Sequence, residues 1–173
     1  MPSTVAAAVQ SNLVVIRQGI ALLAVIGDER YATRVPVAYH ATIGGHMRHI
    51  IEHYLGFLNG LEDGTVDYEN RARDPLMEND PAYAGTVLTA IAGRLQVVAR
   101  ETDDRSLPVH AETSEHTAAD SSVLRELEFL LSHTIHHYAL VAVMARLQDC
   151  EPDEGFGVAP STLKHQQQLA CAP

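Results

Sequence analysis

Four long stretches with apolar residues at helical spacing constrain the fold of this chain more than any other feature. They run from about Ser3 to Ile26, Ala41 to Leu61, Asp80 to Thr102 and Ser121 to Gln148. Apolar residues recur every three or four positions in each stretch, which places them on one face of an α-helix. No stretch alternates convincingly like a half-buried strand. The pattern predicts an all-α protein, a four-helix bundle with long connecting loops.

Local signals mark several ends of these helices. Asp80-Pro81 is typical of a helix start, with Asp as the N-cap and Pro at the first helical position. Gly27-Asp28 ends the first helix, and Pro36 interrupts the segment after it. Gly44-Gly45 weakens the start of the second helix. Close backbone packing and a fraying helix start both explain this pair.

The connecting segments Glu62–Asn79 and Asp103–Ala119 are polar and longer than usual bundle loops. They are expected to form long crossovers or lids over one end. We predict one helical domain over residues 1–149. Residues 150–173 contain Pro, Gly and a Gln triplet, and are expected to form a loose C-terminal tail.

Composition excludes some functions. The net charge is −10 and no Lys/Arg run exceeds two residues, which argues against nucleic acid and against an anionic membrane surface. Cys150 and Cys171 form no CxxC pair, so a reducing cytoplasm is expected. The start of the chain has no features of a secretion signal. Arg17, Gln18 and histidines break the longest apolar stretches, so no membrane span is expected.

Six of the ten histidines lie in two short stretches. His133 and His137 are four residues apart, so they share a helical face and can share a metal ion. Their stripe also holds Leu130, Leu140 and Met144, which predicts that they face the core. His136 is turned about 100° from His137. On the second helix one side carries His46, His49 and His53, any of which can complete a three-histidine set.

A single buried histidine is usually only hydrogen-bonded. Several unliganded imidazoles buried together are costly, because polar groups removed from water need partners. The pair and the second cluster together therefore favour a metal site. Three neutral imidazoles leave a divalent ion with open positions for water or substrate, as catalytic sites require.

Both histidine stretches resemble the DinB/YfiT-like superfamily of bacterial metal-binding four-helix bundles. The resemblance is carried by residues 42–50 and 125–138, and by Val66-Asp67-Tyr68 and Arg71-Ala72-Arg73 in the long loop. It covers roughly residues 3–148. It implies metal ligands His49, His133 and His137, with zinc, nickel or iron bound, and frequent homodimers. His46, His53 and His136 are then candidates for side chains that orient the ligands.

The superfamily includes thiol-dependent S-transferases, a mycothiol-dependent isomerase and the metal domain of ergothioneine-forming enzymes. The resemblance therefore implies a metal-dependent enzyme acting on a small molecule such as a thiol. Transfer of a low-molecular-weight thiol is the first expectation and hydrolysis the second. The alternative is a non-catalytic metal- or small-ligand-binding protein. Fold and metal do not settle the reaction.

Other residues have more than one interpretation. Glu126 lies seven positions before His133. It is interpreted as a general base, as a carboxylate that orients ligands, or as a solvated residue at the helix start. Arg71 and Arg73 either recognise a substrate carboxylate or tie the loop to Asp67 or Glu69. Tyr68 and Tyr138 either donate a hydroxyl near the metal or pack. The remaining histidines are expected to be solvated: His40, His110, His116 and His165.

Overall fold

The computed structural model describes residues 3–110 and 117–170, and most of them are helical. This confirms the predicted all-α class. Each predicted stretch corresponds to one long helix whose ends differ by a few residues. The long helices are α1 (Thr4–Ile26), α3 (Ile43–Asp63), α5 (Pro81–Glu101) and α6 (Val123–Arg146).

Short elements connect or follow the long helices. They are α2 (Asp28–Ala32), a 3-10 turn (Pro36–Ala38), α4 (Pro75–Asn79), β1 (Val109–His110), β2 (Ala118–Ala119) and α7 (Pro160–Ala170). β1 and β2 pair antiparallel within the loop between α5 and α6. The polar segments predicted as plain loops therefore contain local structure of their own.

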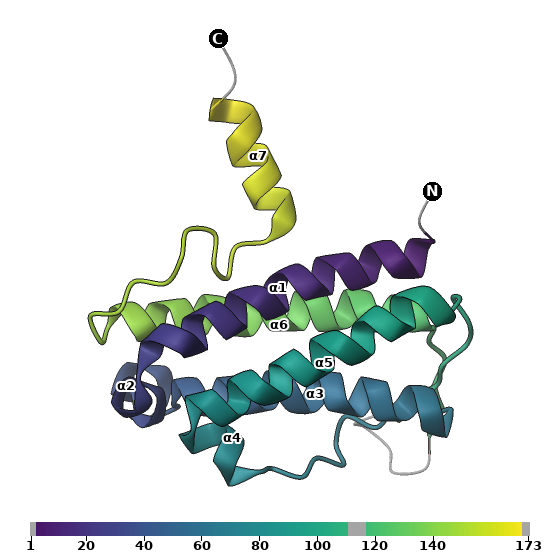
Figure 1. The fold of residues 1–173 in the computed structure, drawn as a ribbon, viewed down its shortest axis with the longest axis horizontal. Coiled ribbons are helices and arrows are strands. Elements are labelled where there is room, and N and C mark those ends of the chain that lie inside the picture. The colour runs from purple at the N-terminus through teal and green to yellow at the C-terminus, as the bar shows by residue number, and fades with distance from the viewer. Residues whose placement is uncertain (1–2, 111–116, 171–173) are drawn as a thin grey trace.

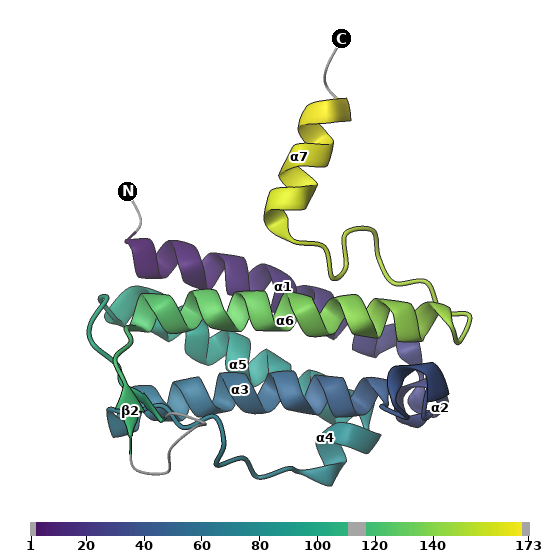
Figure 2. The same ribbon diagram turned by 180° about the vertical axis from the view of Figure 1, so that it is seen from behind.

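The four long helices lie side by side (Figures 1 and 2), with α1 and α3 each packed against both α5 and α6. α3 and α5 run in the same direction, so the chain must return along the length of α3 before α5 begins. A 21-residue helix is roughly 30 Å long. The segment 64–80 spans this distance and includes α4. Of the two expectations for the loop, the crossover is the one observed.

Side-chain caps explain where the long helices begin. Ser3, Thr42, Asp80 and Ser122 each accept a hydrogen bond from the backbone N–H three residues later. The predicted start at Asp80-Pro81 is confirmed. α1 ends at Gly27, where φ is 76°, a backbone angle that glycine adopts without steric cost.

Gly44 is buried in the first turn of α3, against the crossover segment. A Cβ atom at this position would collide with the backbone carbonyl of Glu78 and would lie 2.9 Å from the Tyr31 ring. Close backbone packing, the first of the two explanations, accounts for this glycine. The α3–α4 contact could not form with a side chain at position 44.

A polar network is buried among the apolar residues of the core. Asn12 of α1 donates to the Leu127 carbonyl oxygen of α6 at 3.0 Å and accepts from the Tyr54 hydroxyl of α3 at 2.7 Å. Thr134 of α6 donates to the same tyrosine oxygen at 3.2 Å. Because polar groups in the core need partners, this network sets how three helices are rotated and aligned.

The buried stripe of α6 differs from the predicted one. Thr134 and Tyr138 are buried, whereas Leu140 is 42% exposed. His133 and His137 therefore lie half-buried at the edge of the stripe and do not point into the centre of the core. The predicted stripe and the observed stripe both have helical spacing, and the packing partners of α6 decide which of the two faces inward.

The C-terminal segment contains more structure than the predicted loose tail. Phe156 is buried and stacks on Tyr138 with ring centroids 4.5 Å apart. α7 then projects away from the four long helices (Figures 1 and 2). The segment is thus anchored by one aromatic contact before the chain leaves the helical core.

By length and composition alone, α1 and α5 are apolar enough to cross a membrane. In α1, half of the residues in its apolar window are buried inside the protein, and a core helix meets the same criterion. The expectation that nothing spans a bilayer remains a prediction.

Candidate metal site

Packing of α3 on α6 brings the two histidine stretches together. The Nε2 atoms of His49 and His133 lie 3.0 Å apart, and the Nδ1 atoms of His46 and His137 lie 2.9 Å apart. His53 joins this cluster, with its ring centroid 4.1 Å from that of His133. The three imidazoles of α3 and the two of α6 are at least 80 positions apart in sequence, so only the helix packing makes the two groups neighbours.

Three of these residues, His49, His53 and His133, bring one ring nitrogen each within 4.8 Å of one another. These are the distances over which side chains could hold one metal ion. Two members of the triad implied by the resemblance, His49 and His133, belong to this group.

His137, the third residue implied by the resemblance, lies beside the group. Its ring centroid is 4.6 Å from that of His49 and 4.5 Å from that of His133. Its Nδ1 atom faces His46, which makes His46 its hydrogen-bond partner. His136 is exposed, and its ring centroid lies 5.3 Å from that of His137 in an edge-on arrangement. The geometry thus leaves His53 and His137 as alternatives for a third ligand.

Burial keeps these imidazoles neutral. It is the main reason that the pKa falls to about 3 for His49 and His137 and to about 4 for His133, and neighbouring histidines lower each further. Burial also lowers the pKa of His46 and His53. Neutral rings crowd together without charge repulsion, and a neutral imidazole carries one nitrogen lone pair.

Hydrogen bonds determine which nitrogen of His53 is available. Its Nδ1–H donates to the backbone carbonyl oxygen of His49 at 2.7 Å. The Nε2 lone pair is therefore left free, the arrangement commonly seen for histidines that bind metals. His133 has a buried Nδ1 with no hydrogen-bond partner among the described residues.

Aromatic rings form one wall of the cluster. Tyr68 stacks on His53 with centroids 5.2 Å apart, and Phe129 lies 5.3 Å from both His133 and Tyr68. Tyr68 was a candidate from its sequence motif, whereas Phe129 was not. Its position four residues before His133 on the same helix was the available signal.

Glu126 supports this wall from behind. It is 3% exposed and accepts hydrogen bonds from the Tyr68 hydroxyl at 2.7 Å and from the Ser121 hydroxyl at 2.5 Å. It is thus not the solvated residue that one interpretation expected, and neither of these partners is a histidine. Burial and the Glu126 carboxylate raise the pKa of Tyr68, so this hydroxyl remains a donor. Glu126 orients Tyr68, and Tyr68 covers His53.

Arg71 reaches the cluster from the crossover segment. Its Nη1 donates to His49 Nδ1 at 2.6 Å. Asp67 does not bind Arg71 but accepts from the backbone amides of Glu69 and Asn70. Arg71 therefore ties the loop to a predicted metal ligand, which neither interpretation of this arginine anticipated. Arg73 is exposed.

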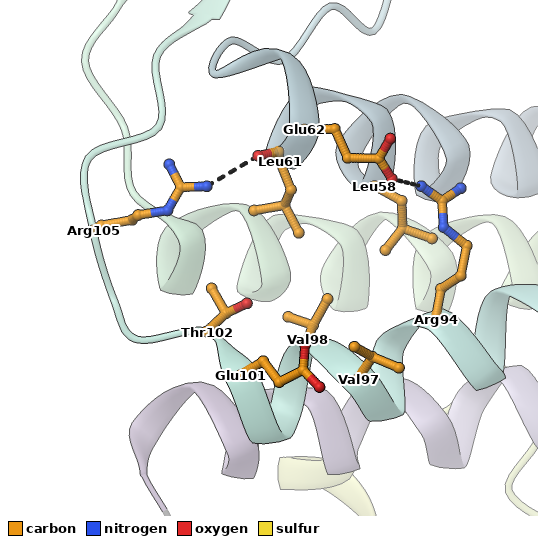
Figure 3. A pocket seen from close by; sticks show the side chains of 9 residues that line it. All are labelled: Leu58, Leu61, Glu62, Arg94, Val97, Val98, Glu101, Thr102 and Arg105. Carbon is orange, nitrogen blue, oxygen red and sulfur yellow. Dashed lines mark hydrogen bonds and ion pairs between the residues drawn. The ribbon is translucent and has the colours of Figure 1, made fainter.

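The surface pockets nearest to functional candidates and to the ends of the helices lie outside the histidine cluster. One, of about 240 Å³, is lined by Tyr68, Phe129 and Glu126, and none of the clustered histidines lines it. The other, of about 320 Å³, lies between the ends of α3 and α5 and has an ion pair between Glu62 and Arg94 along its rim (Figure 3).

Among the other predicted positions, His40, His110 and His165 are exposed as expected. Tyr138 is buried in the core, which makes it a packing residue. His116 lies outside the described residues.

Comparisons with protein-family models, with curated proteins and with solved structures find no significant match. The resemblance to the DinB/YfiT-like superfamily therefore rests on the sequence motifs alone.

Proposed function

We propose that this protein binds one divalent metal ion between α3 and α6, through His49, His133 and a third histidine. The observation that carries the proposal is the 3.0 Å approach of the His49 and His133 Nε2 atoms. Two nitrogens bound to one tetrahedral zinc ion at about 2.0–2.1 Å lie about 3.3 Å apart. The rings need to separate only slightly to fit such an ion.

The third ligand is His53 or His137, and a different observation supports each of them. His53 is supported by its position within 4.8 Å of the other two and by its free Nε2 atom. His137 is supported by the resemblance to the DinB/YfiT-like superfamily, in which the last helix supplies two ligands. Zinc, nickel and iron all accept imidazole nitrogen.

We propose that the protein is a DinB-like four-helix bundle that acts as a metal-dependent enzyme. Transfer of a low-molecular-weight thiol is the reaction we propose first, and hydrolysis the second. A divalent ion held by three imidazoles lowers the pKa of a thiol or water bound at its open position. The chain's own residues would keep the ligands neutral and oriented: Tyr68 and Phe129 cover one side of the cluster, and Glu126 holds Tyr68 in place. The same proposal includes that the protein is a homodimer and that it lies in a reducing cytoplasm.

Metal analysis of untagged protein tests the site. We expect a stoichiometric metal in the wild type and its loss in His49→Ala and His133→Ala. Comparison of His53→Ala with His137→Ala identifies the third ligand, because only the variant lacking it should lose the metal. His40→Ala, an exposed histidine away from the cluster, is the control. A wild-type protein without metal, or metal retention by all four cluster variants, would contradict the proposal.

Turnover separates the enzyme from a metal-binding protein without activity. Loaded and metal-stripped protein would be compared with a low-molecular-weight thiol plus an electrophile, and with an activated ester. Metal-dependent turnover of either substrate supports the enzyme. Stable metal binding without turnover of both favours the non-catalytic alternative.

A further inference from the structure

Arg71 holds His49 in a form that cannot bind a metal through Nε2. A guanidinium group only donates hydrogen bonds, so the His49 Nδ1 atom that receives Arg71 Nη1 must be unprotonated. A neutral His49 then carries its proton on Nε2, the atom that faces His133. That proton occupies the position of the lone pair that a metal needs.

Metal binding therefore requires Arg71 to move. When His49 ligates through Nε2 as a neutral imidazole, its proton lies on Nδ1. Two N–H donors would then face each other across the 2.6 Å that now separates Nδ1 from Arg71 Nη1. This contact is repulsive, so the guanidinium must find another acceptor.

Glu52 is a hydrogen-bond acceptor in the protein interior. It is 4% exposed, and neither carboxylate oxygen has a hydrogen-bond partner among the described residues. The Arg71 Nε–H is likewise buried and unpartnered. A buried carboxylate without a partner is costly, and the bidentate pair with a guanidinium is its strongest remedy.

The crossover segment lies over the part of α3 that contains Glu52. Asp67 and Tyr68 lie against Gly56, and Glu78 pairs with Arg48 at 3.2 Å, so these contacts flank Glu52 on both sides. Glu52 follows His49 by three residues and is its neighbour on the helix surface. A side chain that reaches His49 from this segment therefore lies against the same stretch of α3 as Glu52.

We propose that Arg71 and Glu52 form a metal-responsive pair. Without metal, Arg71 binds His49; with metal, it binds Glu52, and His49 is released to ligate. This inference rests on the proposed metal site and makes Arg71 and Glu52 positioning residues for it. Occupancy of the site is thereby linked to the conformation of the crossover segment.

Zinc affinity, measured by chelator competition in a double-mutant cycle, tests the pair. Glu52→Gln should weaken zinc binding about tenfold, because Arg71 then has no better acceptor to move to. Arg71→Ala should bind zinc at least as tightly as the wild type, since nothing then holds the His49 proton on Nε2. In the Arg71→Ala background, Glu52→Gln should have no further effect. Arg73→Ala, an exposed arginine two residues away, is the matched control.

Three results have distinct meanings. A wild-type chain that binds no zinc removes the proposed metal site and this inference with it. Zinc binding in which Glu52→Gln has the same effect with and without Arg71 overturns this inference alone. Weaker binding in Arg71→Ala also overturns it, because Arg71 would then support the metal instead of competing with it.

Fluorescence gives an independent readout, because the chain has no tryptophan. Ala72 is exposed beside Arg71, so Ala72→Trp places a reporter on the crossover segment. Zinc should shift the emission of this variant and should not shift it when Glu52→Gln or Arg71→Ala is added. An unchanged spectrum on zinc saturation of Ala72→Trp would contradict the movement.

Discussion

At the scale of single residues, the site is governed by protonation and by hydrogen-bond direction. The five clustered imidazoles are neutral because burial disfavours their charged forms. His53 is held with a free Nε2 by a carbonyl oxygen, whereas His49 is held with a protonated Nε2 by Arg71. The two rings therefore differ in readiness for a metal even though they lie one turn apart on the same helix.

The lowered histidine pKa values predict that metal-free protein loses stability as the pH falls from about 7 toward 4. The pKa of His49, His133 and His137 lies at about 3, 4 and 3 in the folded state, below the ordinary 6.5. The unfolded chain binds more protons throughout this interval, so unfolding becomes easier as the pH drops. Above the ordinary pKa these groups add no pH dependence. Thermal melts across this range check the sign.

Substitutions separate the histidines from the carboxylates, which also titrate in acid. His49→Gln and His137→Gln should each flatten the decline in melting temperature, and the exposed His40→Gln should not. Identical pH profiles for all three variants would show that the clustered histidines are not the cause.

Tyr68→Phe removes a hydroxyl that donates to a buried carboxylate. We expect the free energy of unfolding to fall by roughly 1–2 kcal/mol, because Glu126 then keeps Ser121 but loses the Tyr68 hydroxyl as a hydrogen-bond donor. The ring that stacks on His53 is unchanged. Urea unfolding with an unaltered m-value measures the loss. Tyr39→Phe, at a residue 98% exposed, should stay within about 0.5 kcal/mol of the wild type.

At the scale of elements, contacts between segments decide what each local feature means. The α3 helix carries three histidines toward α6 on one side and lies under the crossover segment on another. Gly44 allows α4 to lie directly on α3, and this contact anchors the end of the segment that carries Arg71. The position of the crossover thus depends on a glycine that is unfavourable for the helix itself.

Substitution by alanine should change the stability in opposite directions at two glycines in the long helices. Gly44→Ala should destabilise the protein by more than about 1 kcal/mol, because a Cβ atom there collides with the Glu78 backbone. Gly93→Ala should stabilise it by roughly 0.5–1 kcal/mol, since nothing lies within 4 Å of a Cβ atom at that position of α5. Chemical denaturation of both variants makes the comparison. Equal shifts in one direction would mean that helix propensity alone governs both positions.

At the scale of the whole molecule, α1 contributes no histidine to the site but controls its geometry. Asn12 binds α6 through a backbone carbonyl and α3 through Tyr54, so it sets the relation between the two helices that carry the histidines. The site therefore depends on a residue on a third helix.

Asn12→Leu should lower the free energy of unfolding by roughly 2–3 kcal/mol, because it removes buried hydrogen bonds and leaves the Tyr54 hydroxyl without its acceptor. It should also weaken metal binding by loosening the alignment of α3 and α6. Unfolding curves and zinc titration measure the two effects. Gln10→Ala, at an exposed position of α1, is the control. Wild-type stability in Asn12→Leu would contradict a stabilising role for the buried polar network.

The sequence by itself determined the all-α class, the approximate bounds of four long helices and the two histidine stretches. These properties depend on residues close together in the chain, whose period, caps and glycines act locally. His133 and His137 were recognisable as a pair because a helix aligns residues four apart, and the capped start at Asp80 because its partners lie within one turn.

Only the tertiary structure decided how those parts combine. It turned α6 so that Thr134 and Tyr138 face the core, placed His53 beside His49 and His133, and brought Arg71 onto His49 across the crossover. It also left Glu52 buried with no hydrogen-bond partner in the part of the chain that the structure describes. Each of these outcomes depends on contacts between segments distant in sequence, where steric fit and the need to satisfy buried polar groups select one arrangement among several that the local pattern allows.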